Sequence, residues 1–291
     1  MLKDVNIHCK KVMNVNIRRP AVIGQFYPNS KSKLIDNIEE CFTHDLGPGK
    51  IPPITKNEKI FGAIVPHAGY IYSGPIAANT FYAISSDTPE TVIILGPNHW
   101  GIGSPIAVAK QIFWETPLGK IEVDDDAADK LVNMSIIVDH DNFAHEKDHC
   151  LEVQLPFLQY IYREFKILPI IMSIQDQTTS IELGNTISEI AKEKKTQIIA
   201  SSDFTHYETQ IAASKKDSEL IKAICELDVK KFYILLERNN ISACGYGAIA
   251  SVMTTVKKLG ATKGLLLKYA TSGDITGDKS AVVGYSSIIF V

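Results

Sequence analysis

The sequence predicts an α/β fold with a mainly parallel central β-sheet flanked by helices, formed by a single domain at 17–291. Short apolar runs alternate along the chain with longer segments of helical pattern, as in sheets that helices cover on both faces. Of the 291 residues, 45% are hydrophobic and 22% are charged, which is an ordinary globular composition. Residues 1–16 are polar and without pattern, which indicates a mobile lead-in before the domain.

The first half of the predicted domain contains two buried strands and two helices. The runs FGAIVP (61–66) and TVIILGP (91–97) are short and apolar, which is typical of strands covered on both faces. A proline opens the segment 75–85 and suits the first turn of a helix. Three aspartates open the segment 124–134, where they would stabilise a helix N-terminus.

The second half repeats this alternation of helical and strand-like segments. Pro156 must lie in the first turn of its helix or kink it. Pro169 indicates a strand at a sheet edge or with a bulge. The last two strands are expected to close the sheet as an antiparallel pair. We expect helices at 149–163, 179–195, 208–225, 228–238 and 246–259, and strands at 166–172, 196–201, 264–270 and 281–291.

Charge and cysteine content exclude several classes of protein. The net charge is -3, from 30 basic and 33 acidic residues, and gives no reason to expect nucleic acid or a membrane surface as a partner. Five cysteines without a CxxC pair argue against a disulfide framework or a zinc finger and favour a reducing compartment. The first residues lack the apolar segment of a signal peptide, and the long uncharged stretches at 91–109 and 239–256 contain glycine and polar residues that do not suit a membrane span. We therefore expect a cytoplasmic protein.

Polar groups follow three of the predicted strands. His67 follows the strand at 61–66, His99 follows the strand at 91–97, and Asp203 and His206 follow the strand at 196–201 in SSDFTHYE. Ligands of parallel sheets bind beyond the carboxyl ends of the strands, where these loops would converge. A single histidine in a loop usually has only a hydrogen-bonding role, but three such strand ends favour a functional site, because histidine is the commonest metal ligand and a frequent proton shuttle.

Cys244 lies just before a predicted helix that starts near Gly245. The positive end of a helix dipole lowers the pKa of a thiol, and the resulting thiolate would be a good metal ligand or nucleophile. A small buried residue that only packs against the backbone is the alternative for an isolated cysteine.

A literal HExxH pattern occurs at 145–149. On a helix, His145 and His149 would share one face and could bind zinc, with Glu146 as the general base of a peptidase. The surrounding residues are mostly polar and no third ligand follows, so we expect this pattern to be a chance match. His149 and Glu152 are three residues apart and could both face the strand-end site, with Gln154 nearby.

Eight motifs occur from about Arg18 to the C-terminus, namely RRPAVIGQFYP, PHAGYIYSGPIAA, ILGPNHWG, ETPLGKIEVD, HEKDHCLEVQLPFL, SSDFTHYE, CGYGAIA and YATSGDITGDKSAVVGY. Together, and in this order, they resemble the Memo-like family. The resemblance implies a fold similar to the class III extradiol (LigB-like) dioxygenases and a metal site of two histidines and one cysteine. The sequence departs from the family pattern at Asp148 and Cys150, where glutamate and serine are expected.

The resemblance assigns roles to individual residues. The implied metal ligands are His67, His99 and Cys244, and the implied catalytic residues are Asp203, His206 and His149. Tyr70, Tyr72, Trp100, Glu152 and Gln154 are expected to bind substrate.

Two functions from different classes compete. The first is redox chemistry on an unknown small substrate with iron(II) or copper, or with zinc as a further candidate, bound so weakly that isolated protein can lack it. The second is a non-catalytic module that binds a peptide or protein, and an HExxH zinc peptidase is a weaker alternative. An AMMECR-like protein and a radical-SAM protein are partners that the resemblance implies for prokaryotic members.

Overall fold

The computed structural model describes residues 16–52, 59–86 and 88–291. The lead-in expected at 1–16 therefore lies outside the described residues, apart from Asn16. The strands are β1 (Ile17–Arg18), β2 (Gly62–Val65), β3 (Thr91–Pro97), β4 (Ile106–Val108), β5 (Phe113–Thr116), β6 (Gly119–Glu122), β7 (Asp139–His140), β8 (Lys166–Met172), β9 (Thr196–Ser201), β10 (His206–Glu208), β11 (Gly264–Thr271) and β12 (Val282–Phe290). The helices are α1 (Lys31–Thr43), α2 (Tyr70–Ile84), α3 (Asp125–Met134), α4 (Leu155–Ile161), α5 (Gln177–Ala191), α6 (Gln210–Cys225), α7 (Val229–Arg238), α8 (Tyr246–Leu259) and α9 (Ser272–Thr276), with 3-10 turns η1 (Phe143–His145) and η2 (Glu152–Gln154).

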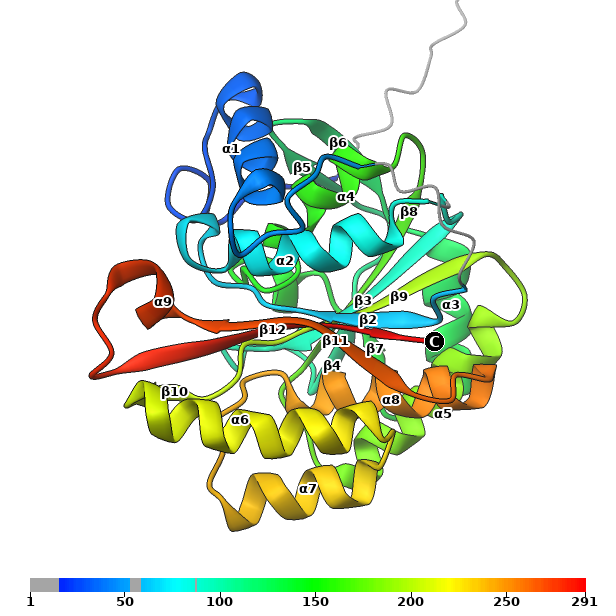
Figure 1. The fold of residues 1–291 in the computed structure, drawn as a ribbon. Coiled ribbons are helices and arrows are strands. Elements are labelled where there is room, and N and C mark those ends of the chain that lie inside the picture. Colours follow the sequence, from blue (N-terminus) through cyan, green and yellow to red (C-terminus); the bar gives the residue numbers. More distant parts are fainter. Residues whose placement is uncertain (1–15, 53–58, 87) are drawn as a thin grey trace, which may run out of the picture.

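The larger of two sheets has the strand order β10-β12-β2-β9-β3-β8-β4-β7, and β11 also pairs with β12 (Figure 1). Its four central strands β2, β9, β3 and β8 run parallel to one another. Antiparallel strands flank them, since β12 is antiparallel to β2 and β4 is antiparallel to β8. The predicted α/β fold with a mainly parallel central sheet is confirmed, and so is the closing antiparallel pair of β11 and β12.

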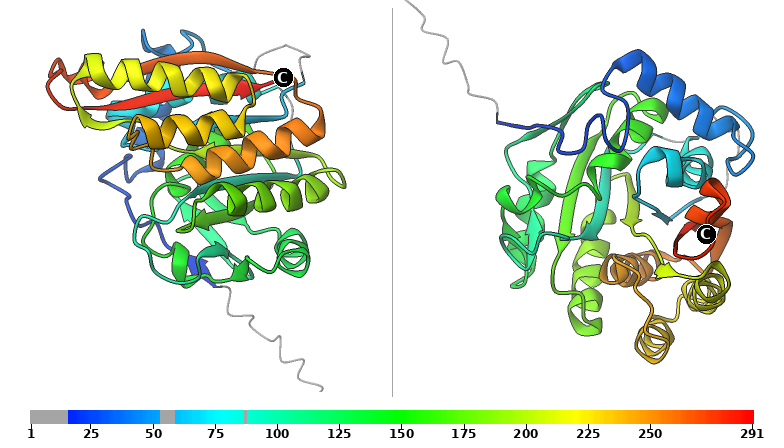
Figure 2. Two further views of the ribbon diagram at one scale, coloured as in Figure 1. Left: turned by 90° about the horizontal axis from the view of Figure 1, so that it is seen from below. Right: turned by 90° about the vertical axis from the view of Figure 1, so that its left-hand side faces the viewer.

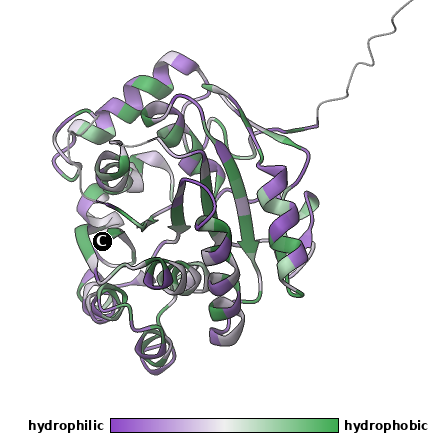
Figure 3. Cartoon of the chain, turned by 90° about the vertical axis from the view of Figure 1, so that its right-hand side faces the viewer, coloured by the Kyte–Doolittle hydropathy of each residue, from purple (hydrophilic) through white to green (hydrophobic). Residues whose placement is uncertain are grey.

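Helices cover both faces of this sheet, as Figures 1 and 2 show. One core contains side chains of α3, α5, α6, α7 and α8, and the other contains side chains of α1, α2, α4 and the small sheet. Side chains alternate between the two cores along β3, where Ile93 and Leu95 face the first core and Val92 and Ile94 face the second. This double burial explains why the middle of each central strand consists mainly of apolar residues (Figure 3).

The prediction that Pro169 marks a sheet edge or a bulge is wrong. Strand β8 lies inside the sheet, between β3 and β4. Pro169 accepts a bond from the backbone N–H of Ala109 at the point where the pairing with the short strand β4 ends. In a β-strand, the N–H and the C=O of one residue point toward the same neighbouring strand. The missing N–H of Pro169 would therefore point toward the end of β4, where few backbone hydrogen bonds form.

Two other prolines differ in how well the sequence predicts their positions. Pro156 lies in the first turn of α4, as expected. The sequence predicts a helix that opens at Pro75, but α2 begins at Tyr70 and contains Pro75 in its interior. Pro75 lacks the N–H that would reach the carbonyl of Ile71, a residue of the first turn that is 71% exposed.

The smaller sheet has the order β1-β5-β6 and has no counterpart among the predicted strands. It joins Ile17 and Arg18 to Phe113 and Trp114 in parallel register. Within the described part of the chain, no helix is both long and apolar enough to span a membrane.

A candidate metal centre at the strand ends

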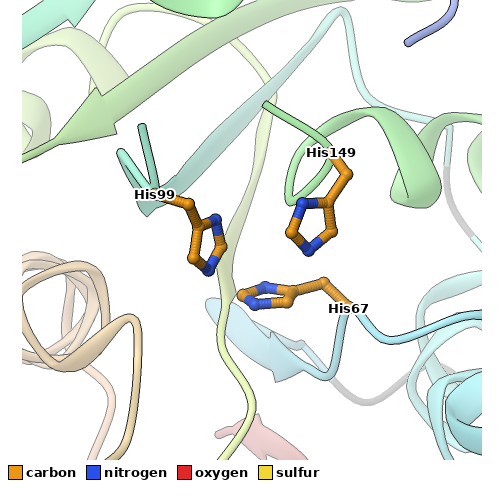
Figure 4. A group of neighbouring side chains, drawn as sticks. All are labelled: His67, His99 and His149. Carbon is orange, nitrogen blue, oxygen red and sulfur yellow. The ribbon is translucent and has the colours of Figure 1, made fainter. Parts of the chain in front are cut away.

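Three imidazoles converge at the carboxyl edge of the parallel strands. His67 follows β2 and His99 follows β3, while His149 lies in the segment before η2. The three side chains come from separate loops and point toward one another (Figure 4). Their candidate ligand atoms all lie within 4.8 Å of one another. The strand-end pattern thus brings His67 and His99 together, and the structure adds His149 to them.

The ring contacts describe a tight cluster. The ring of His67 is 5.2 Å from that of His99 and 5.4 Å from that of His149, in edge-on geometry. The rings of His99 and His149 stack at 4.7 Å. Phe26 closes one side, with its ring 4.8 Å from His149. No local pattern indicates Phe26 as a site residue, because its segment joins the site only through tertiary packing.

Asp148 holds His99 in place. Its carboxylate accepts the backbone N–H of His99 at 2.7 Å and lies 3.1 Å from Nδ1 of the same residue. A carboxylate can only accept, so Nδ1 carries a proton, and in the neutral form of this imidazole Nε2 keeps its lone pair. Although burial opposes it, hydrogen bonds and the charge of His99 lower the pKa of Asp148, which keeps the carboxylate ionised. This carboxylate–imidazole arrangement is typical of histidines that bind a metal.

Cys244 lies directly beside the imidazole cluster. Its Sγ atom is 3.0 Å from Nε2 of His67 and accepts the backbone N–H of Asp203 at 3.2 Å. Helix α8 begins at Tyr246 with Gly245 as its N-cap, as predicted. A Cβ atom on Gly245 would lie 2.6 Å from the carbonyl oxygen of Ser201, so glycine permits the close approach of α8 to β9 that places Cys244 here.

The expected lowering of the Cys244 pKa is wrong for the metal-free protein. Burial raises the pKa of this thiol, and the nearby charge of Asp203 raises it further. These effects outweigh the backbone hydrogen bond from Asp203 and the contact with Ser202, which lower it. Cys244 is therefore a protonated thiol at neutral pH until something displaces the proton.

The imidazoles of His67 and His149 are neutral for related reasons. Burial lowers the pKa of His67 well below its ordinary value, and the neighbouring His149 and His99 lower it further. Burial and the charge of His99 lower the pKa of His149 to about 4. Neutral imidazoles are the form that binds metal ions.

Asp203 lies in the loop after β9 and His206 begins β10, and the two are held in different ways. Asp203 is buried and accepts the backbone N–H of His67 at 2.7 Å. Burial raises the pKa of Asp203 to about 6, although hydrogen bonds from the backbone and the charges of His206 and His99 lower it. Nδ1 of His206 donates to the carbonyl oxygen of Ser242 at 2.9 Å.

Glu152 has a structural role that differs from the predicted binding of substrate. Its carboxylate forms a buried ion pair with Arg18 at 2.5 Å. It also accepts the hydroxyl of Tyr27 at 2.7 Å and the backbone N–H groups of Ala21 and Val22. Glu152 thus ties residues 18–27 to the fold, and its oxygens are fully used.

Gln154 also differs from the predicted binding of substrate, because its amide faces inward. Its Nε2 donates to the carbonyl of Pro66 and to the hydroxyl of Ser201, each at 2.9 Å. Ser201 in turn lies 3.0 Å from Nδ1 of His67. Sequence reasoning missed Ser201, although it ends the strand predicted at 196–201.

The three predicted substrate-binding aromatics divide into two groups. Tyr70 is buried and donates to the carbonyl of Val153 at 2.7 Å, so its hydroxyl is used within the fold. Tyr72 and Trp100 are 41% and 56% exposed, and Trp100 donates to the carbonyl of Lys147 at 3.0 Å. Of the three, Tyr72 and Trp100 are exposed enough to contact a ligand.

The HExxH segment does not form the helix that a zinc peptidase requires. His145 ends the turn η1, and the residues from there to His149 form bends and irregular backbone. His145 is 1% exposed and packs edge-on against Trp114 at 5.5 Å, away from the three imidazoles. This geometry supports the interpretation of HExxH as a chance match.

Comparisons with known proteins agree on one family. A family model described as Memo-like protein matches residues 18–289. A MEMO1 family protein of Nitrosopumilus maritimus is 52% identical over 276 residues, which cover 94% of this chain and 100% of the relative. MEMO1 family proteins of Methanopyrus kandleri and Methanocaldococcus jannaschii are 48% and 50% identical, each covering 94% of this chain and 98% of the relative.

A solved structure resembles the fold. It is the crystal structure of an uncharacterized protein from Escherichia coli K12, with a TM-score of 0.50 over 78% of this chain and 98% of that chain. The sequences are 10% identical, so the likeness concerns the fold alone.

Proposed function

Because this chain belongs to the Memo-like family, we propose that it binds one metal ion at the strand-end site and, with iron or copper bound, carries out redox chemistry on a small substrate. The proposed ligands are His67, His99 and Cys244, and the proposed metal is iron(II) or copper, with zinc as a further candidate. The observation that carries the proposal is the cluster of three imidazoles beside a thiol at one edge of a parallel sheet.

The donor set fits such an ion. Metal–nitrogen bonds of about 2.0–2.1 Å and a metal–sulfur bond of about 2.3 Å place neighbouring donors roughly 3.1–3.6 Å apart. The 3.0 Å separation between Sγ of Cys244 and Nε2 of His67 is close to that range. Thiolate and imidazole are donors that suit copper, iron and zinc.

His149 is a competing third ligand. Its candidate ligand atom lies within 4.8 Å of those of His67 and His99, whereas Cys244 contacts the cluster through Nε2 of His67. A site of three imidazoles would be neutral, and replacing one imidazole by thiolate would add a negative charge and favour softer ions such as copper(I). The choice between these residues therefore decides which metal the site prefers.

The remaining side chains suggest how a substrate would be handled. A bound iron or copper ion would supply electron transfer and a position for an oxygen or nitrogen atom of the substrate. With a pKa of about 6, Asp203 can hold or release a proton near neutral pH. Tyr72 and Trp100 offer exposed aromatic faces to a ligand that enters the site.

The alternative is a binding module without catalysis, and one observation favours it. Tyr72 and Trp100 leave large aromatic surfaces exposed, which is typical of surfaces that recognise peptides or proteins. A module of this kind needs no metal, so the two functions differ in whether the imidazoles are used.

Metal analysis of protein purified without oxygen tests the proposal. After supplementation with iron(II) or copper, we expect close to one ion per wild-type chain, and much less in His67→Ala and His99→Ala. Glu146→Gln serves as a control, because Glu146 is exposed and lies outside the cluster. Wild-type protein that stays metal-free after supplementation with either metal would favour the binding module.

A further inference from the structure

We propose that Ser201 and Gln154 are positioning residues that fix the imidazole of His67 in the tautomer protonated at Nδ1. The lone pair of Nε2 then faces Sγ of Cys244, where a metal ion would bind. The tautomer itself does not depend on a metal, and only its use rests on the proposed function. The inference follows from the protons that are available to each donor along one buried chain of hydrogen bonds.

The chain starts at the side-chain amide of Gln154. Its end group lies 2.9 Å from the carbonyl oxygen of Pro66, and a carbonyl can only accept. The group facing Pro66 is therefore the NH2 group, which has a second proton to donate. That group also lies 2.9 Å from Oγ of Ser201, so Ser201 accepts from Gln154.

The hydroxyl of Ser201 has only one proton, and the structure accounts for it. Oγ lies 2.6 Å from the carbonyl oxygen of Cys150, which again can only accept. The proton of Ser201 is thus directed at Cys150. With one lone pair taken by Gln154, Oγ has one lone pair left, and its remaining partner is Nδ1 of His67 at 3.0 Å.

His67 must therefore be the donor in this contact. A hydroxyl whose proton is used elsewhere can only accept, so Nδ1 carries the proton. Ser201, Gln154 and His67 are 0%, 1% and 2% exposed, so bulk water does not compete for these bonds. A neutral histidine in water prefers the other tautomer, with its proton on Nε2. The buried hydroxyl reverses that preference and leaves Nε2 free at the site.

Nitrogen NMR of reduced, metal-free protein tests the tautomer directly. Long-range ¹H–¹⁵N correlations distinguish a protonated from an unprotonated ring nitrogen, and His67 is assigned from the spectrum that His67→Gln loses. We expect the Nδ1–H form in wild type and a majority of the Nε2–H form in Ser201→Ala. Wild-type protein with the proton on Nε2 would overturn the inference without any variant.

Further variants separate positioning from general packing. Ser201→Thr keeps the hydroxyl and should keep the wild-type tautomer. Ser251→Ala is the matched control, because Ser251 is a buried serine whose hydroxyl donates to a backbone carbonyl elsewhere, that of Ser180. It should also leave His67 unchanged. Gln154→Met should give a smaller shift than Ser201→Ala, and a wild-type tautomer ratio in Gln154→Met would remove Gln154 from the proposal.

Metal affinity gives the second readout. Residues that orient a histidine ligand typically change metal affinity by about 10–100-fold. We expect a loss of that size for copper(I) in Ser201→Ala and none in Ser251→Ala. Unchanged affinity together with an unchanged tautomer in Ser201→Ala would contradict the inference. If wild type binds neither copper(I) nor iron(II), the proposed function fails, and the NMR result still decides the tautomer.

Discussion

Metal binding through Cys244 should release one proton for each ion bound. Burial and the charge of Asp203 raise the pKa of the Cys244 thiol above its ordinary value, so the thiol is protonated at neutral pH. The pKa values of His67 and His149 are lowered, so these two imidazoles carry no extra proton to lose. An ion bound by the thiolate must therefore displace the thiol proton, whereas an ion bound by these imidazoles displaces none.

The magnitude follows from the proton count. With one proton released, the affinity should rise about tenfold for each unit of pH between roughly pH 7 and pH 9. Metal affinity rises with pH because the raised pKa keeps the proton on Sγ in the free protein, and a higher pH makes removal of that proton easier.

Calorimetry with zinc as a redox-inactive probe measures this release. Titrations of reduced protein in buffers with different enthalpies of ionisation give the number of protons directly. We expect wild type and His149→Ala to release about one proton for each zinc ion bound. Cys244→Ser should release close to none, because it lacks the thiol proton. Release of no proton by wild type, with affinity that does not change with pH, would refute Cys244 as a ligand and favour His149.

Three further predictions concern neighbouring residues. Asp148→Asn should lower metal affinity about 10–100-fold in competition titrations, because an amide no longer guarantees an acceptor for Nδ1 of His99; unchanged affinity would contradict this role. Glu152→Gln should lower the free energy of unfolding in denaturant by about 3–5 kcal/mol, because it leaves Arg18 charged and buried without its partner; a stable variant with weakened substrate binding would restore the predicted binding role. Glu146→Gln should leave metal content and activity unchanged, and peptide cleavage abolished by this change would establish a peptidase.

The strands that hold the site could be predicted because their pattern is local. The apolar runs at 91–97 and 166–172 coincide with β3 and β8, and both faces of the sheet are buried. Strands of this kind contain little but apolar residues, so the polar residue at each end stands out. For the same reason, the sequence alone predicts that His67 and His99 lie together at this edge of the sheet, as the structure shows.

Other features depend on contacts that no local pattern records. The ion pair of Arg18 with Glu152 spans 134 residues of sequence. The small sheet is not predicted because β1 has only two residues and β5 and β6 have four each, which is too short to show a clear period. The pKa of Cys244 was wrongly expected to fall, because the start of α8 is visible in the sequence and the burial of the thiol is not. The spacing in the sequence also places His149 near the site without revealing that its ring stacks on His99.

Titration of reduced, metal-free protein with iron(II) and copper(I) tests the proposed metal site most directly. The comparison includes wild type and the single variants His67→Ala, His99→Ala, His149→Ala and Cys244→Ser, each first shown to be folded. We predict one site per wild-type chain and a large loss of affinity in the variants of His67, His99 and Cys244, with a smaller loss for His149. Equal affinity in all five proteins would show that this cluster is not a metal site.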